Sequence, residues 1–187
     1  MPSRRRAVIS VWDKTGIIDL ARALSRAGCE LLSTSKTAQA IRDSGIPVTE
    51  ISDYTGSPEI LGGRVKTLHP RIAGGILTTH KDDTVDPIDF VVCNLYPFED
   101  GIARGAGADE LIELIDIGGV TLLRAAAKNW RYVTVVPHPR FYAQVASALD
   151  SGAGIGDATR RSLAAEAFRI VAGYDAAIAA YFDRPAD

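Results

Sequence analysis

Residues 7–51 read AVISVWDKTGIIDLARALSRAGCELLSTSKTAQAIRDSGIPVTEI, and this stretch decides the fold. Residues 7–12 form a short apolar run rich in β-branched side chains, which predicts a buried strand. Apolar residues then recur at helical spacing from Ile17, and Gly28 is expected to close that helix. The alternation continues with a strand at residues 29–32, a helix from Thr37 to near Gly45 and a strand at residues 46–51. Strands that alternate with helices predict a parallel sheet covered by helices.

The remainder of the chain continues this α/β pattern after one interruption. Residues 52–80 are rich in Gly, Pro and Thr, and only residues 72–77 form an apolar run, so little regular structure is expected there. Further strands are expected at residues 90–95 and 132–136, and helices at residues 108–115, 121–128, 141–149 and 159–182, with Gly118-Gly119 as a break. No repeat or linker divides residues 1–187. This predicts a single three-layer domain, a mostly parallel sheet with helices on both faces.

Composition narrows the class of protein. The chain has 187 residues, a formal net charge of -2 and 47% hydrophobic residues, which is typical of a globular protein and excludes disorder as the dominant state. The near-neutral charge argues against a nucleic-acid partner, and no apolar run is long enough for a membrane span. Cys29 and Cys93 both lie in apolar stretches, which predicts buried free thiols and a cytoplasmic location. His69, His80 and His138 lack metal-ligand spacing, so no metal is expected.

Two strand-to-helix turns are candidate anion sites. The first is SVWDKTG at residues 10–16, where Lys14 lies beside a helix start, and the second is STSKT at residues 33–37. Helix N-termini carry unpaired N–H groups and a positive dipole end, so they bind phosphate. Taken alone, each turn is better explained as a helix cap with its lysine in solvent. Because ligands gather at the carboxyl ends of parallel strands, two such turns together favour a shared anion site.

Two later segments carry further polar candidates. GGRVKTLHP, at residues 62–70, places Arg64 and Lys66 on one side if it is extended, which suits a phosphate, and a basic surface loop is an even alternative. The CNLYP segment ends the expected central strand, so that Asn94 and Tyr96 emerge at the ligand edge of the sheet. The alternative for Tyr96 is an ordinary tyrosine at a strand terminus.

DIGGVTLLRAAAKN, at residues 116–129, is the last candidate. Asp116 precedes the Gly-Gly pair, and Arg124 and Lys128 share one helix face at i,i+4 spacing. Alanines around Lys128 permit close packing, so that this lysine could donate or accept a proton. The alternative is an ordinary exposed basic face.

These four motifs occur together and in this order, and on them the chain closely resembles the inosine monophosphate (IMP) cyclohydrolase domain, the N-terminal half of a bifunctional purine-biosynthesis enzyme. The resemblance runs from about residue 7 to residue 182 and leaves out the formyltransferase half. It implies a methylglyoxal-synthase-like fold and the dehydrative ring closure of 5-formamidoimidazole-4-carboxamide ribotide to IMP. It also implies a nucleotide substrate, no metal or organic cofactor, a homodimer, and a separate formyltransferase that supplies the substrate if the chain stands alone.

The resemblance also implies roles for particular residues. Phosphate and ribose contacts fall to Lys14, the 34–37 turn, Arg64 and Thr67, whereas Lys66, Asn94 and Tyr96 lie near the formyl and amide groups. Asp116 and Lys128 engage the carboxamide, with Lys128 as the expected proton-transfer group. The catalytic set is therefore Lys66, Tyr96, Asp116 and Lys128. The substrate-binding set is Ser10, Trp12, Lys14, Thr34, Ser35, Lys36, Thr37, Arg64, Thr67, Cys93, Asn94, Ile117 and Gly118.

The sequence departs from this family at several positions. The family turn reads STGGT or STGST, so Ser35 replaces a glycine, which is expected to exclude a positive φ or to crowd the phosphate. Ala73 replaces a second histidine of the family pattern, and Trp12 replaces a tyrosine or a smaller residue. The segment at residues 79–86 is also shorter than is usual in the family. These departures leave two alternatives to IMP formation. One is a paralogue that closes the ring of a related nucleotide in specialised metabolism, and the other is a non-catalytic nucleotide-binding module.

Overall fold

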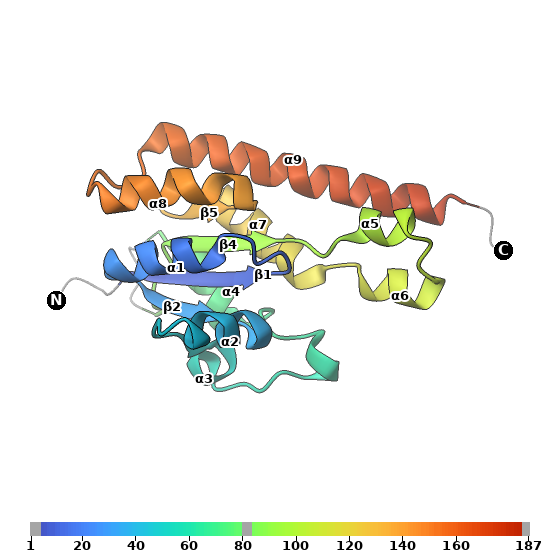
Figure 1. The fold of residues 1–187 in the computed structure, drawn as a ribbon, viewed down its shortest axis with the longest axis horizontal. Helices are drawn as coiled ribbons and strands as arrows, with labels where there is room; N and C mark the ends of the chain where they lie inside the picture. The colour runs from blue at the N-terminus through green and yellow to red at the C-terminus, as the bar shows by residue number, and fades with distance from the viewer. Residues whose placement is uncertain (1–4, 80–83, 185–187) are drawn as a thin grey trace.

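The computed structural model describes residues 5–79 and 84–184, and the described residues form one sheet with helices around it (Figure 1). The strands are β1 (Arg6–Val11), β2 (Glu30–Ser33), β3 (Thr49–Glu50), β4 (Phe90–Asn94) and β5 (Thr134–Val136). Their order is β3-β2-β1-β4-β5, and every neighbouring pair is parallel. The carboxyl ends of all strands therefore meet at one edge, which lies to the right in Figure 1.

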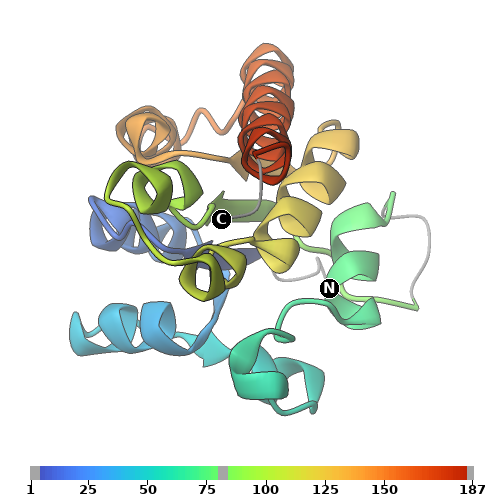
Figure 2. The ribbon, with the colours of Figure 1, turned by 90° about the vertical axis from the view of Figure 1, so that its right-hand side faces the viewer.

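Helices cover both faces of this sheet. They are α1 (Ile17–Arg26), α2 (Ser35–Asp43), α3 (Ile51–Thr55), α4 (Pro70–Leu77), α5 (Phe98–Ala103), α6 (Ala108–Glu113), α7 (Ile117–Lys128), α8 (Tyr142–Asp150) and α9 (Asp157–Phe182), with 3-10 turns η1 (Leu61–Gly63) and η2 (Pro139–Phe141). In Figure 2, α1 and α8 lie on one side of the sheet, and α4 and α7 lie on the other. This confirms the expected three-layer α/β architecture.

Two apolar clusters hold the layers together. The main one buries the central strands, where Val8, Ile9, Val91 and Val92 are fully shielded from solvent. The second joins α5 and α6 to the outer half of α9, around Phe98, and forms the lobe at the right of Figure 1. This lobe matters for function because it stands beside the carboxyl edge of the sheet.

The expectation of little regular structure in residues 52–80 is wrong for α3 and α4, whereas residues 56–69 contain only the short turn η1, and residue 80 lies outside the described residues. α3 and α4 form there, and they bury Tyr54 and Ile76 respectively. The hydrophobic pattern did not reveal them because each helix is short and buries only a few side chains. The start of α4 carries clear sequence signals, since Pro70 is its first residue and the His69 side chain accepts a hydrogen bond from the Arg71 N–H. A pattern of two or three apolar residues is too short to show helical period.

The expected break at Gly118-Gly119 is also wrong, because both glycines lie inside the first turn of α7. They allow close packing instead. A Cβ at Gly118 would lie 2.7 Å from Thr67 Oγ1, and one at Gly119 would lie 2.4 Å from Asp116 Oδ2. α7 therefore begins directly after Asp116, four residues earlier than expected.

Two smaller expectations also fail, and one helix was not expected. The strand expected at residues 46–51 is reduced to the two residues of β3, because Ile51 already begins α3. β5 begins at Thr134, after a turn, rather than at residue 132. α5 was not expected and forms because Phe98 buries its ring in the lobe cluster.

No helix in the described ranges is long and apolar enough to cross a membrane.

Candidate active site

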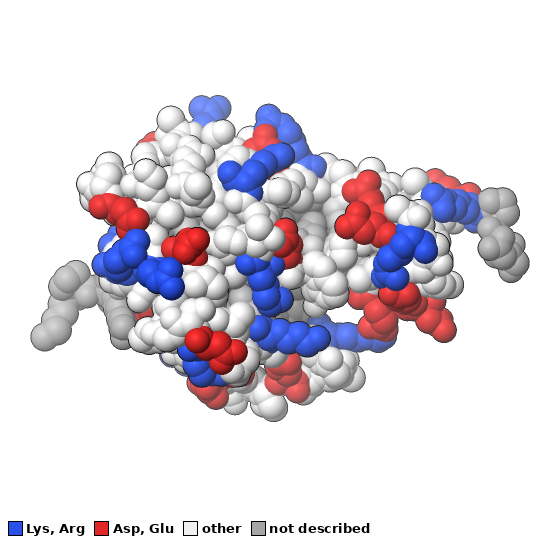
Figure 3. Space-filling model, viewed as in Figure 1, with Lys and Arg blue, Asp and Glu red and all other residues white. Residues whose placement is uncertain are grey.

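A cavity of about 760 Å³ opens at the carboxyl edge of the sheet, and its volume is typical of small-molecule sites. Its walls come from the ends of β1, β2 and β4, the first turn of α2, residues 62–67 and residues 110–119. In Figure 3, basic side chains gather at the centre of the visible face, and acidic side chains lie opposite them on the lobe. The predicted site residues that line the cavity are Ser10, Trp12, Lys14, Thr34, Lys36, Thr37, Arg64, Lys66, Thr67, Asn94, Tyr96, Asp116, Ile117 and Gly118.

The turn after β1 is held by Asn94 at the end of β4. Asn94 Oδ1 accepts hydrogen bonds from the N–H groups of Trp12 at 2.8 Å and Asp13 at 2.9 Å, and its Nδ2 donates to the Asp13 carbonyl at 2.8 Å. The Lys14 ammonium lies 3.3 Å from the Trp12 carbonyl, on the same turn. Asn94 was expected near the formyl group; it lines the cavity, and its amide also holds the backbone that carries Lys14.

The second turn places the N-terminus of α2 against the cavity. Ser33 and Thr37 donate their hydroxyl hydrogens to β1 carbonyls, at 2.7 Å to Ile9 and 3.1 Å to Val11, which binds the turn to the central strand. Ser35 lies in the first helical turn, and Leu61 is the only described non-glycine residue with a positive φ. Ser35 therefore has no positive φ, as expected, and the crowding of a phosphate by its side chain stays a prediction.

The basic segment forms a tight hairpin. Ile60 and Val65 pair across it, and Leu61, Gly62 and Gly63 all have positive φ, at 54°, 64° and 90°. Arg64 was expected to hold phosphate, and here its guanidinium forms a two-pronged ion pair with Glu113 of α6, with 3.2 Å between Nε and Oε2. This pair joins the hairpin to the lobe across the cavity, where an anionic ligand would compete with Glu113.

Lys66 follows the hairpin and is also paired. Its Nζ lies 3.4 Å from Glu59 Oε2 and 3.5 Å from Ser35 Oγ, and Ser35 donates a hydrogen bond to the other oxygen of Glu59. The three side chains come from separate segments and meet beside the start of α2. Ser35 belongs to this cluster and is not among the residues that line the cavity.

Aromatic and acidic groups also line the cavity. The rings of Trp12 and Tyr96 meet edge to face with their centroids 5.2 Å apart, and the Trp12 side chain is half exposed. Burial raises the pKa of the Tyr96 phenol, and the nearby Asp116, Cys93 and Glu59 raise it further. Tyr96 therefore stays protonated near neutral pH and can donate a hydrogen bond.

Asp116 caps the N-terminus of α7. Its Oδ1 accepts a hydrogen bond from the Gly119 N–H at 2.6 Å, and its own N–H donates to the Tyr174 hydroxyl at 2.8 Å. Burial raises the pKa of the Asp116 carboxyl above its ordinary value, although hydrogen bonds from the Gly119 and Tyr96 N–H groups oppose part of that rise. A half-buried carboxylate with a raised pKa is suited to accept a proton.

Besides Ser35, two predicted site residues are not brought to the cavity. Lys128 is the last residue of α7 and is exposed, so it lies about 18 Å along the helix axis from Asp116 at the usual rise per residue. Cys93 is buried within β4, where its Sγ lies 3.8 Å from the Gly119 carbonyl, and burial raises its pKa. Neither side chain is among those that line the cavity.

Comparison with known families decides the identity of this fold. A model of the "MGS-like domain" matches residues 16–121, which is more than half of the chain. The chain belongs to the MGS-like domain family. A second model, "AICARFT/IMPCHase bienzyme", matches residues 126–187 of this MGS-like chain.

Curated relatives place the MGS-like chain more narrowly. It is 47% identical over 183 residues to the "Bifunctional purine biosynthesis protein PurH" of Persephonella marina, covering 93% of this chain and 36% of that protein. It is 50% identical over 186 residues to PurH of Anaeromyxobacter dehalogenans, covering 95% of this chain and 36% of that protein. It is 49% identical over 185 residues to PurH of Sorangium cellulosum, covering 95% of this chain and 35% of that protein.

The chain thus spans about a third of the length of these relatives and is homologous to their IMP cyclohydrolase part. Among solved structures, it is similar to the crystal structure of ForH, with a TM-score of 0.81 and 36% identity. That match covers 95% of this chain and 96% of the ForH chain.

Two residues of the MGS-like site were missed in the sequence. Glu59 lies in the segment that was expected to be irregular, and Glu113 lies on a short helix with three acidic residues, so neither stood out as a partner for a cation. The signal that could have found them is the pair of cations in this segment, Arg64 and Lys66, because each can pair with a nearby carboxylate.

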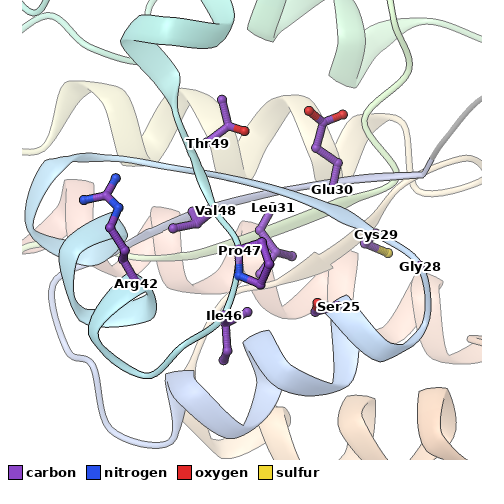
Figure 4. Close-up of a pocket in the computed structure, with 10 residues that line it drawn as sticks. All are labelled: Ser25, Gly28, Cys29, Glu30, Leu31, Arg42, Ile46, Pro47, Val48 and Thr49. Atoms are coloured by element: carbon purple, nitrogen blue, oxygen red, sulfur yellow. The ribbon is translucent and has the colours of Figure 1, made fainter.

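A second, smaller cavity lies at the opposite edge of the sheet, where β2 and β3 begin (Figure 4). Its volume is about 460 Å³, and Leu31, Ile46 and Val48 supply an apolar floor. Arg42 pairs with Glu50 at 3.0 Å beside it, and burial raises the pKa of the Cys29 thiol to about 11.

In the part of the chain that the structure describes, no group of three or more His, Cys, Asp or Glu side chains could hold a metal ion.

Proposed function

We propose that this chain is an IMP cyclohydrolase, which closes the ring of 5-formamidoimidazole-4-carboxamide ribotide to give IMP. The observation that carries the proposal is the meeting of Lys66, Tyr96 and Asp116 at one cavity, beside the N-terminus of α2, which is suited to a phosphate. Homology to the IMP cyclohydrolase part of PurH supports it.

The reaction joins the carboxamide nitrogen of the substrate to its formyl carbon. The formyl oxygen leaves as water after it has gained two protons, one from the carboxamide nitrogen and one from the formamido nitrogen. The chemistry therefore needs a group that stabilises negative charge on that oxygen, a group that accepts a nitrogen proton, and a grip that aligns the two arms of the substrate.

Tyr96 and Lys66 are suited to the formyl oxygen. The raised pKa of Tyr96 keeps its phenol protonated, so the hydroxyl donates a hydrogen bond as charge develops. The Lys66 ammonium adds a positive charge in the same cavity. Both groups act most strongly where burial lowers the effective dielectric around them.

Asp116 is suited to the carboxamide arm. Its carboxylate accepts the hydrogen bond of the carboxamide N–H and then its proton, and its raised pKa brings it closer to the basicity that this task requires. Ile117 and Gly118 line the cavity at the start of α7, where the positive end of the helix dipole faces the ligand. The role expected for Lys128 therefore passes to Asp116 in this proposal.

The phosphate is assigned to the turns after β1 and β2. Lys14, Thr34 and Lys36 line this part of the cavity, and the N-terminus of α2 supplies N–H groups that face an anion. Anchoring the phosphate at one end lets binding energy position the reacting groups at the other end. The formylated substrate must come from a separate formyl-transfer reaction.

The test is a direct assay in which purified protein is mixed with the formamido ribotide and IMP formation is followed by ultraviolet absorbance. We expect turnover within the usual range of roughly 1–1000 per second. Absent turnover from folded protein would contradict the proposal. Calorimetry with IMP would then show whether the cavity is a non-catalytic nucleotide-binding site.

A second candidate is ring closure of a related nucleotide. It is favoured by Ser35, which takes a position where the resembled family carries glycine and which binds Glu59 beside the cavity. The identities of 47–50% with PurH proteins favour the first candidate. Comparing kcat/KM for the normal ribotide with that for ring-modified analogues separates the two.

A further inference from the structure

Glu59 makes contacts that no role assigned so far explains. Its Oε2 lies 3.4 Å from the Lys66 ammonium, and its Oε1 accepts a hydrogen bond from the Ser35 hydroxyl. The Lys66 and Glu59 side chains are 27% and 33% exposed, so both are largely withdrawn from solvent. The carboxylate thus holds a lysine on the hairpin and a serine on α2 in one arrangement.

The backbone of the hairpin is fitted to this arrangement. At Gly63, a Cβ would lie 2.7 Å from Lys66 Cε, 3.0 Å from its Nζ and 3.4 Å from Glu59 Oε2. The positive φ of Gly63 turns the hairpin tip toward the pair, which is a conformation that side-chain-bearing residues rarely adopt. The Lys66 stem is therefore confined between the glycine backbone and the Glu59 carboxylate.

Glu59 also acts on Tyr96. Its negative charge is one of the causes that raise the pKa of that phenol. A partly exposed ion pair contributes only about 0–1 kcal/mol to folding, so the value of this pair as a stabilising contact is small. What the pair does fix is the position of an ammonium group between α2 and the cavity.

From these contacts we infer that Glu59 is a positioning residue for the ring-closing reaction: it holds the Lys66 ammonium where the formyl oxygen of the substrate develops charge. Ser35 fixes the carboxylate in turn. The inference rests on the proposed function, because Lys66 acts on the substrate there. Misplacing a catalytic group by as little as 1 Å can cost about a hundredfold in rate, so loss of Glu59 is expected to affect kcat rather than substrate binding.

The test compares Glu59→Gln with Glu50→Gln, a matched control. Glu50 has similar side-chain exposure, at 34%, and pairs with Arg42 away from the cavity. We expect Glu59→Gln to lower kcat by at least about tenfold, to change KM and the Kd for IMP by less than about threefold, and to leave Tm close to that of Glu50→Gln. Glu59→Asp is expected to recover part of kcat, because it restores the negative charge.

A double-mutant cycle decides whether Glu59 acts through Lys66. If it does, adding Glu59→Gln to Lys66→Ala lowers kcat no further. A full additional loss, an unchanged kcat in Glu59→Gln, or a rise in KM with normal kcat would each overturn the inference while wild-type turnover stands. Absence of turnover in the wild type would overturn the proposed function, and this role with it.

As a readout independent of turnover, trace labelling with acetic anhydride followed by mass spectrometry reports the freedom of each lysine. Lys66 is expected to react several-fold faster in Glu59→Gln than in the wild type, with Lys14 and Lys36 as internal references. Equal labelling of Lys66 in the two proteins would also overturn the inference.

Discussion

Replacing Asn94 with alanine tests whether this side chain builds the anion turn or touches the substrate. Asn94 is 8% exposed and makes three hydrogen bonds to the backbone of Trp12 and Asp13. Each such bond contributes about 1 kcal/mol net, so Asn94→Ala should lower the free energy of unfolding by about 3 kcal/mol. For a chain of this length, that loss corresponds to a fall in Tm of about 6–12 °C.

The same substitution should weaken nucleotide binding, because the turn that it frees carries Lys14. We expect urea unfolding to give the predicted loss and calorimetry to give an IMP affinity at least about tenfold lower. Asn129→Ala is the matched control. Its Nδ2 donates to the Ile76 and Thr78 carbonyls at 2.7 and 2.8 Å, far from the cavity, so it should lose about 2 kcal/mol with IMP affinity unchanged.

Two results would refute this reasoning. If Asn94→Ala loses less than about 1 kcal/mol, the three hydrogen bonds do not hold the turn as described. If it keeps both stability and IMP affinity but loses kcat, Asn94 contacts the reacting formyl group, as the sequence resemblance implied.

Three further perturbations test other parts of the site. Asp116→Asn keeps the helix cap but removes a carboxyl whose pKa is raised in the folded state. Because the folded protein binds that proton more tightly than the unfolded chain does, the wild type should lose stability relative to the variant as pH rises through the raised pKa. Urea unfolding at pH 3.5 and pH 7 should show this loss, and the opposite trend would contradict it. Gly118→Ala puts a methyl group 2.7 Å from Thr67 Oγ1 and should lower the free energy of unfolding by about 1–3 kcal/mol and remove most turnover. Gly107→Ala is the control and should lose little stability, because a Cβ there meets nothing within 4 Å. Equal losses of stability in thermal melts would refute the packing argument. Lys128→Ala should keep turnover within about threefold of wild type, since Lys128 lies at the far end of α7, and a large loss of kcat would place this lysine in the reaction after all.

The order of strands and helices was predictable where the hydrophobic pattern was long enough to show a period. Residues 7–45 gave β1, α1, β2 and α2 to within a few residues, and the parallel sheet that they imply places the cavity at the carboxyl edge. α3 and α5 were not predictable in this way, because each buries only two residues and shows no period.

The residues at the site were predictable as a set but not in their individual contacts. Asp116 and Lys128 were grouped because they share a motif, yet they lie at opposite ends of one helix, which the misread Gly-Gly pair concealed. The amide of Asn94 and the counterions Glu59 and Glu113 depend on contacts between distant segments. No local pattern encodes such contacts.

The dimer and the supply of formylated substrate remain predictions from the resemblance. Sedimentation of the purified chain over a range of concentrations would test the first. A protein that sediments as a monomer at micromolar concentration would contradict it.

The most direct test of the proposed chemistry is the initial rate of IMP formation from the formamido ribotide, measured for wild type and Lys66→Ala side by side. We predict ready turnover by the wild type and a loss of at least about a hundredfold in kcat for the variant, with IMP still bound by both. A folded wild type that binds IMP but forms none from the ribotide, or a Lys66→Ala variant as fast as wild type, would contradict the assignment of this cavity to ring closure.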